Sequence, residues 1–95
     1  MIEKIFEELR DIGIVRSRDQ FSAEWLGREK SYLRSLQSKK RKPSVAVLAT
    51  CGARLLRNAE QLNKADAAIA RAKSAELRRL ANTCFEQILD EGLRG

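Results

Sequence analysis

The second half of the chain is a long segment with a periodic apolar pattern and almost no helix breakers. Between Val45 and Asp90 there is no proline, and the one glycine is Gly52. In the first part of this segment large aliphatic residues recur every seven positions, at Leu48, Leu55, Leu62 and Ile69. That spacing keeps one face of a helix apolar. The segment therefore predicts long helices and places the chain in the all-α class.

A change of phase divides this segment into two helices. The later apolar positions follow a second stripe, made of Leu77, Leu80, Ala81, Cys84, Ile88 and Leu89. Between the two stripes, Asn63 suits the end of a helix and Asp66 suits an N-cap. We predict helices over residues 44–63 and 66–91, with the second folded back on the first. The alternative is one continuous rod that pairs with a second copy, although a regular coiled coil would keep one repeat throughout.

The composition argues against catalysis and against a metal site. The 95 residues suffice for one small domain, and with 5% aromatic residues its core must be mainly aliphatic. The chain has no histidine, no glycine-rich phosphate loop and no pair of carboxylates on a cleft-forming element. We therefore expect a protein that is not an enzyme and binds no cofactor. Cys51 and Cys84 lie on predicted apolar faces, where buried free thiols are expected and a disulfide is the alternative.

No membrane-targeting segment is evident. The first residues, MIEKIFEELR, carry acidic side chains within their apolar pattern, which a signal peptide does not. No apolar run approaches the ~20 residues that cross a bilayer. We therefore expect a cytoplasmic protein without a membrane partner.

Two short helices are predicted near the N-terminus. Apolar residues with helical spacing stand at Ile2, Ile5, Phe6, Leu9 and Ile12. They predict an amphipathic helix over 2–9, which Gly13 ends in the left-handed conformation. Ser17 followed by Gln20 has the spacing of a capping box, so a second helix is predicted over 18–26.

The net charge is concentrated in the stretch that follows Gly27. Residues 28–42 contain seven basic side chains and one acidic side chain, Glu29. Removing these eight from the 19 basic and 13 acidic residues of the chain leaves 12 of each, so the stretch carries the whole net charge of +6. A charge gathered on one element is typical of a protein that binds a polyanion.

Within this stretch we predict a helix over 29–38 and a basic corner after it. Leu33 and Leu36 are its inward residues, and its outer face carries only cations and short polar side chains. The corner is Lys39-Lys40-Arg41-Lys42. Pro43 ends this element, because the residue before a proline is disfavoured in helical conformation, and Ser44 suits the N-cap of the next helix.

The order helix, glycine turn, helix, basic corner, proline, helix resembles the Cro/C1-type helix-turn-helix of phage repressors. The resemblance covers 17–56, with Gly27 as the turn glycine and Leu33 and Leu36 as the buried residues of the recognition helix. The chain departs from the family at Phe21-Ser22, where Leu-Ala is usual. It also departs at Gln37, where the family has an acidic residue, and at Lys39, where it has a glycine. The run WLGREKSYL is also similar to small uncharacterised bacterial proteins of this length.

The resemblance implies a transcriptional regulator that binds double-stranded DNA with the helix over 29–38 as recognition helix. It places Lys30, Ser31 and Ser35 where side chains read bases, and Ser38, Lys39 and Lys40 near phosphates. Arg34 lies between the two groups, and Arg41 would help to fix the register on the duplex. Lysine and serine side chains can donate to base edges, and cations neutralise phosphates.

The domain organisation that follows is a helix-turn-helix bundle over 1–62 and a C-terminal helix over 63–95 for packing or dimerisation. The apolar stripes of the two long helices offer more surface than the three shorter N-terminal helices can cover, so we expect a homodimer. The competing hypothesis is a helical adaptor without enzymatic activity, whose basic face binds an acidic protein. RNA binding is a third possibility, for which no module signature is present.

Overall fold

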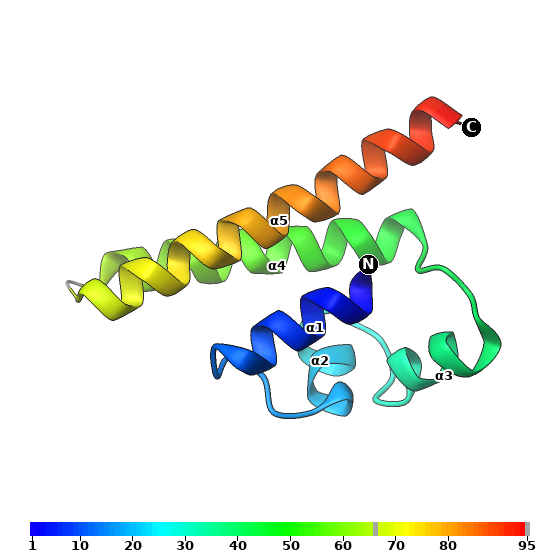
Figure 1. Ribbon diagram of the computed structural model, residues 1–95, viewed down its shortest axis with the longest axis horizontal. Helices are drawn as coiled ribbons and strands as arrows, with labels where there is room; N and C mark the ends of the chain where they lie inside the picture. Colours follow the sequence, from blue (N-terminus) through cyan, green and yellow to red (C-terminus); the bar gives the residue numbers. More distant parts are fainter. Residues whose placement is uncertain (66, 95) are drawn as a thin grey trace.

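The computed structural model describes residues 1–65 and 67–94, which fold into helices without a strand in those ranges. The chain is therefore all-α, as predicted. The helices are α1 (Ile2–Asp11), α2 (Arg18–Glu24), α3 (Tyr32–Lys39), α4 (Val45–Lys64) and α5 (Ala68–Arg94) (Figure 1). No described helix is both long and apolar enough to cross a membrane.

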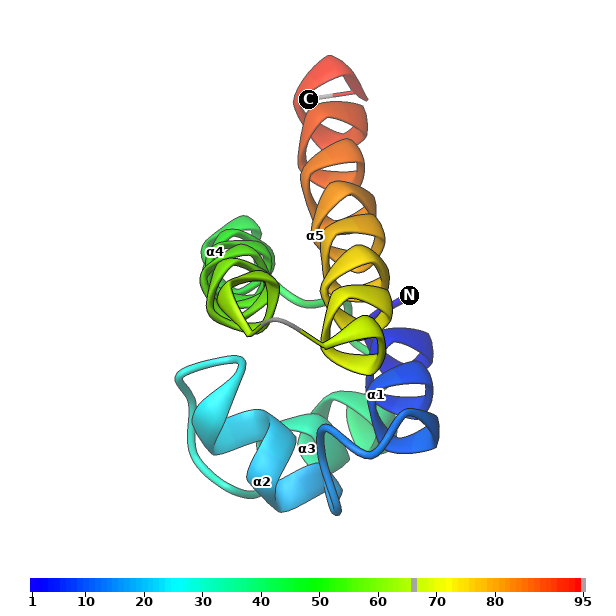
Figure 2. The same cartoon turned by 90° about the vertical axis from the view of Figure 1, so that its left-hand side faces the viewer.

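Helices α4 and α5 form an antiparallel hairpin, so the interpretation as one continuous rod is wrong. Asn63 does not end the first helix of the hairpin as predicted, because α4 continues through Lys64 and the chain leaves it through Ala65 in an extended conformation (φ −75°, ψ 125°). The N-cap predicted at Asp66 lies outside the described residues. α5 crosses α4 at an angle, so its C-terminal end points away from the other helices (Figure 2).

The hairpin is held by an interlocked aliphatic face. Most residues of the predicted stripes are fully or almost fully buried, but Ile69 and Leu89 are exposed. The buried residues of this face are Leu48, Cys51, Leu55, Ala59, Leu77, Leu80, Ala81 and Cys84. Both cysteines are free thiols, as expected. Ser74 of α5 is buried, and its hydroxyl donates a 2.7 Å hydrogen bond to the Ala59 carbonyl of α4.

Gly52 allows α4 and α5 to approach closely at Phe85. A Cβ atom at this position would lie 2.8 Å from Cζ of the Phe85 ring, well inside van der Waals contact. We expect Gly52→Leu to lower the free energy of unfolding by about 1–3 kcal/mol, because the ring has to move out of a packed interface. Urea denaturation followed by circular dichroism measures this change. An equally stable variant would show that the contact is loose.

Helices α1 to α3 form a smaller group against one side of the hairpin (Figures 1 and 2). Gly13 ends α1 in the left-handed region (φ 79°), where the Ile14 N–H donates to the Leu9 carbonyl and the Gly13 N–H to the Arg10 carbonyl. This pair of backbone hydrogen bonds is the Schellman motif, and it confirms the predicted end of the helix at Gly13. The Ser17 hydroxyl accepts from the Gln20 N–H, which confirms the predicted start of α2.

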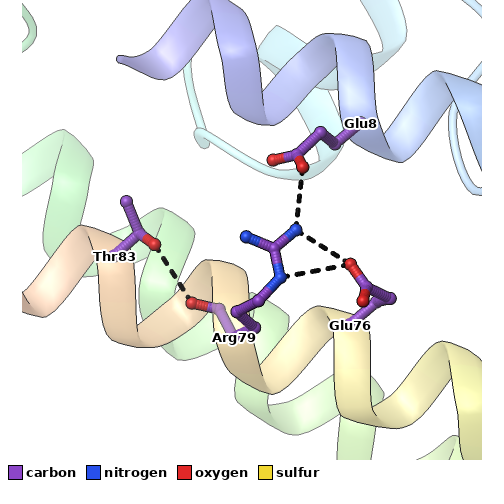
Figure 3. A network of polar contacts seen from close by, with 4 residues as sticks. All are labelled: Glu8, Glu76, Arg79 and Thr83. Carbon is purple, nitrogen blue, oxygen red and sulfur yellow. Dashed lines mark hydrogen bonds and ion pairs between the residues drawn. The ribbon is translucent and has the colours of Figure 1, made fainter.

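An arginine links the hairpin to α1. Arg79 of α5 donates 2.8 Å hydrogen bonds to the carboxylates of Glu8 on α1 and Glu76 on α5 (Figure 3). Its side chain is 51% exposed, so solvent screens the pairs and each contributes little to stability. The buried hydrophobic cluster, which draws residues from every helix, supplies the main attachment of α1 to α5.

Candidate functional site

The connection between α2 and α3 fixes how the basic stretch is presented. α2 ends at Glu24, and Gly27 turns the chain with φ 64°. From α4, the Arg54 guanidinium donates a 2.8 Å hydrogen bond to the Glu24 carbonyl, which satisfies a backbone group at the end of α2. The Tyr32 N–H then closes a turn on the Glu29 carbonyl. Residues 25–31 therefore precede α3 and lie outside both helices.

The predicted start of the recognition helix is three residues too early. The sequence pattern predicts a start at 29, whereas α3 begins at Tyr32, so Lys30 and Ser31 lie in the preceding turn. The physical reason is a tertiary contact. The Ser22 hydroxyl of α2 accepts a 3.1 Å hydrogen bond from the Leu33 N–H in the first turn of α3, and it donates to the Arg18 carbonyl. Ser22 is fully buried, so this bond anchors the N-terminal end of α3 on α2.

The basic corner begins with a lysine in a strained backbone conformation. Lys40 has φ 51° and ψ 40°, and it is the one residue other than glycine with a positive φ among the described residues. The Lys40 N–H donates to the Gln37 carbonyl and the Arg41 N–H to the Leu36 carbonyl. α3 thus ends in a Schellman motif whose glycine-favouring position holds a lysine.

Lys39 and Arg41 of the corner line a surface groove of about 500 Å³. The groove is lined by Gly27, Arg28, Glu29, Ser31, Tyr32, Ser35, Leu36, Lys39 and Arg41. The lining therefore contains three cations, one carboxylate and three hydroxyl groups. The Arg28 guanidinium lies 5.1 Å from the centre of the Tyr32 ring, a cation–π contact that orients it at one edge.

The structure brings together some of the predicted site residues and separates others. Four of them line the groove: Ser31, Ser35, Lys39 and Arg41. Lys30, Ser38 and Lys40 are exposed outside it. Arg34 faces α2, where its guanidinium forms a 3.1 Å ion pair with Asp19.

Sequence reasoning missed Arg28 and Tyr32 as groove residues. Their spacing of four residues is a weak signal, because this spacing predicts a contact only inside a helix. Here Arg28 precedes α3, and the turn after Gly27 brings the two side chains together. The sequence predicts a turn at Gly27 but not the path of the residues between Gly27 and α3.

The cations of this surface are little neutralised by the protein itself. We define the basic face as the cations Arg28, Lys30, Lys39, Lys40, Arg41 and Lys42, together with the groove. Within the described ranges no ion pair is formed by these six side chains, whereas Arg34 is paired. All six residues are exposed. In Figure 2, α3 lies at the opposite end of the molecule from the C-terminus of α5.

The strained corner leads to a prediction about Lys40. A side chain in the left-handed region costs about 1 kcal/mol relative to glycine. We therefore expect Lys40→Gly to raise the free energy of unfolding by about 0.5–1 kcal/mol, as measured by urea denaturation. The matched control Lys42→Gly removes the same charge at a position without positive φ, and no gain is expected there. Equal effects of the two changes would contradict strain at Lys40.

Both thiols are buried between α4 and α5, and their mutual hydrogen bond shifts the two pKa values in opposite directions, down for Cys84 and up for Cys51. The hydrogen bond with Cys84 and burial in the hairpin raise the pKa of the Cys51 thiol, so it stays protonated. In the described part of the chain, no three side chains of His, Cys, Asp or Glu gather where they could hold a metal ion.

Fold and site together define a small all-α protein with one concentrated basic face. The chain belongs to DUF6626, a family of unknown function, which it matches over residues 2–93. No curated protein and no solved structure matches the chain.

Proposed function

We propose that this protein binds double-stranded DNA through the basic face and acts, without catalysis, as a small transcriptional regulator in the cytoplasm. The observation that carries the proposal is a group of six exposed cations that form no ion pair in the described part of the chain, three of which line a groove that also contains hydroxyl groups. Cations that are not neutralised by the protein are available to neutralise phosphates and release condensed counterions. The resemblance to phage-repressor helix-turn-helix proteins supports double-stranded DNA as the polyanion.

The proposed roles follow the positions of the side chains. Arg28, Lys39 and Arg41, which line the groove, would contact phosphates. Ser31 and Ser35 line the same groove, and their hydroxyl groups could bond to base edges or to phosphate oxygens. α3, which spans Tyr32–Lys39, takes the role of recognition helix in place of the helix predicted over 29–38. Arg34 then holds α3 against α2 through Asp19.

One observation favours the alternative, an adaptor whose basic face binds an acidic protein. Residues 25–31 form a longer connection between α2 and α3 than the three or four residues usual in a helix-turn-helix motif. Tyr32 and the half-buried Leu36 also give the groove an apolar part that suits a peptide. An acidic peptide would occupy the same cations, so competition between the two partners is informative.

The test is binding to a labelled random-sequence duplex, followed by fluorescence anisotropy over a salt series. With three to five phosphate contacts, the logarithm of the association constant should fall against the logarithm of salt concentration with a slope of about −3 to −5. Absence of binding at about 50 mM salt would overturn the proposal, because nonspecific DNA binding is strongest at low salt. The adaptor alternative would then direct the search to acidic proteins.

We also propose that the protein acts as a homodimer, because small helix-turn-helix proteins read two half-sites with two copies. The N-terminal helices of the two copies would then carry two basic faces, and α5 would join the copies.

A further inference from the structure

A regular stripe of exposed residues runs along the full length of α5. Its members alternate in steps of four and three residues: Ala68, Ala72, Ala75, Arg79, Asn82, Glu86, Leu89 and Leu93. All eight are exposed, and the two leucines are 67% and 88% exposed. This spacing is the heptad pattern that packs one helix against another. α5 already buries a different face in the hairpin, so the stripe is a second face with apolar residues at both ends and polar residues in the middle.

The stripe is asymmetric in size and in charge. Its first three members are alanines, its last two are leucines, and Arg79, Asn82 and Glu86 lie between them. The charged residues of α5 are also divided unevenly between its two halves. From Ala68 to Leu80, α5 carries four basic residues and one acidic residue, whereas from Ala81 to Leu93 it carries three acidic residues and no basic one.

We propose that α5 pairs antiparallel with α5 of a second copy through this stripe, around a twofold axis between Asn82 and Thr83, which brings the two Asn82 side chains together. Antiparallel pairing places the leucines of each copy on the alanines of the other and Arg79 opposite Glu86 of the second copy. Parallel pairing would set Arg79 against Arg79 and acidic end against acidic end, which is unfavourable. Charge complementarity therefore selects a second copy in one orientation.

The register of the antiparallel pair determines which residue of the second copy Leu93 contacts. Ala72 lies seven residues before Arg79, and Leu93 lies seven residues after Glu86, so pairing Arg79 with Glu86 also pairs Ala72 with Leu93 of the other copy. Ala72 lines a hollow of about 320 Å³ together with Ile12, Ile69, Lys73 and Glu76. An apolar side chain from the second copy thus meets an apolar recess, and Ile69, which is 74% exposed, is covered at the same time.

Arg79 can take part without leaving its own network. Its bonds to Glu8 and Glu76 use Nε and one terminal nitrogen, and Figure 3 shows the other terminal nitrogen without a drawn partner. The half-exposed guanidinium can therefore also meet Glu86 of the second copy. This inference specifies how the proposed homodimer is built, and it does not depend on DNA binding.

The first experiment compares charge variants by sedimentation velocity at micromolar concentration. We expect the unmodified chain to sediment as a dimer and Leu89→Glu/Leu93→Glu to associate about a hundredfold more weakly or not at all, because burial of two leucines per chain is lost. The matched control Ala53→Glu/Gln61→Glu adds the same charge on the exposed face of α4 and should leave the dimer unchanged. A chain that is monomeric, or a dimer that survives the leucine changes, would overturn the proposal.

A second experiment tests the register with exposed positions whose substitution leaves the core intact. Asn82→Cys should give an intermolecular disulfide under mild oxidation, because the two copies of this position meet at the axis. Leu89→Cys alone should give none, whereas a mixture of Ala75→Cys and Leu89→Cys chains should cross-link. Efficient cross-linking of Leu89→Cys to itself would indicate parallel pairing and contradict the inference. Since a monomer can still bind DNA at low salt, failure here is separate from failure of the proposed function.

Discussion

Replacing the three groove cations, in the variant Arg28→Gln/Lys39→Gln/Arg41→Gln, is expected to weaken binding to duplex DNA by about a hundredfold at 0.1 M salt. These side chains line one groove and form no ion pair within the described part of the protein, so each is available to a phosphate. Each lost phosphate contact should also reduce the salt slope by about 1, which gives a slope shallower by about 3. Anisotropy titrations at several salt concentrations measure both quantities.

A matched triple variant separates this local effect from net charge. Lys4→Gln/Arg57→Gln/Lys64→Gln removes the same charge from exposed positions on α1 and α4. We expect its affinity to fall by less than about fivefold and its salt slope to be nearly unchanged, because screening limits the reach of distant charges to about 10 Å. If both triple variants lost affinity equally, binding would depend on net charge alone and the groove would have no special role.

The largest effect on stability is expected for Phe21→Ala. Phe21 of α2 is fully buried, and its ring centre lies 5.7 Å from that of Phe6 on α1, with the two planes tilted by 54°. Removing the ring leaves a cavity at the contact that holds α2 against α1. The free energy of unfolding should fall by about 3–5 kcal/mol, a large part of the total stability of a small domain.

Chemical denaturation followed by far-ultraviolet circular dichroism tests this expectation. Val45→Ala serves as the control, because its side chain is 47% exposed and its loss should cost less than about 1 kcal/mol. A loss below about 1.5 kcal/mol for Phe21→Ala would show that α1 and α2 repack around the missing ring and that this contact is not central to the fold.

Most helix ends could be predicted because they depend on neighbouring residues. Gly13 adopts the left-handed conformation that ends α1, and the hydroxyl groups of Ser17 and Ser44 accept from the Gln20 and Val47 amides as expected. The hairpin could be predicted from the phase shift of the apolar stripes. These features need only local spacing and the absence of helix breakers.

The errors lie where distant parts of the chain decide the conformation. The start of α3 depends on a bond from Leu33 to Ser22, eleven residues away in sequence, and the sequence pattern contains no sign of it. The direction of Arg34 depends on the angle between α2 and α3, which brings Asp19 within reach. The groove itself depends on the chain folding back at Lys40, where a glycine would have been expected. The cations could thus be predicted as a group, but their arrangement could not.

The most direct test of the central claim is to map the DNA contact on the protein by nuclear magnetic resonance. A ¹⁵N-labelled sample would be titrated with a short duplex, and backbone amide shifts would be followed residue by residue. We predict the largest shifts between Gly27 and Lys42 and small shifts along the outer face of α4. Shifts concentrated on α4 or α5, or no shifts at low salt, would contradict a DNA-binding role for the basic face.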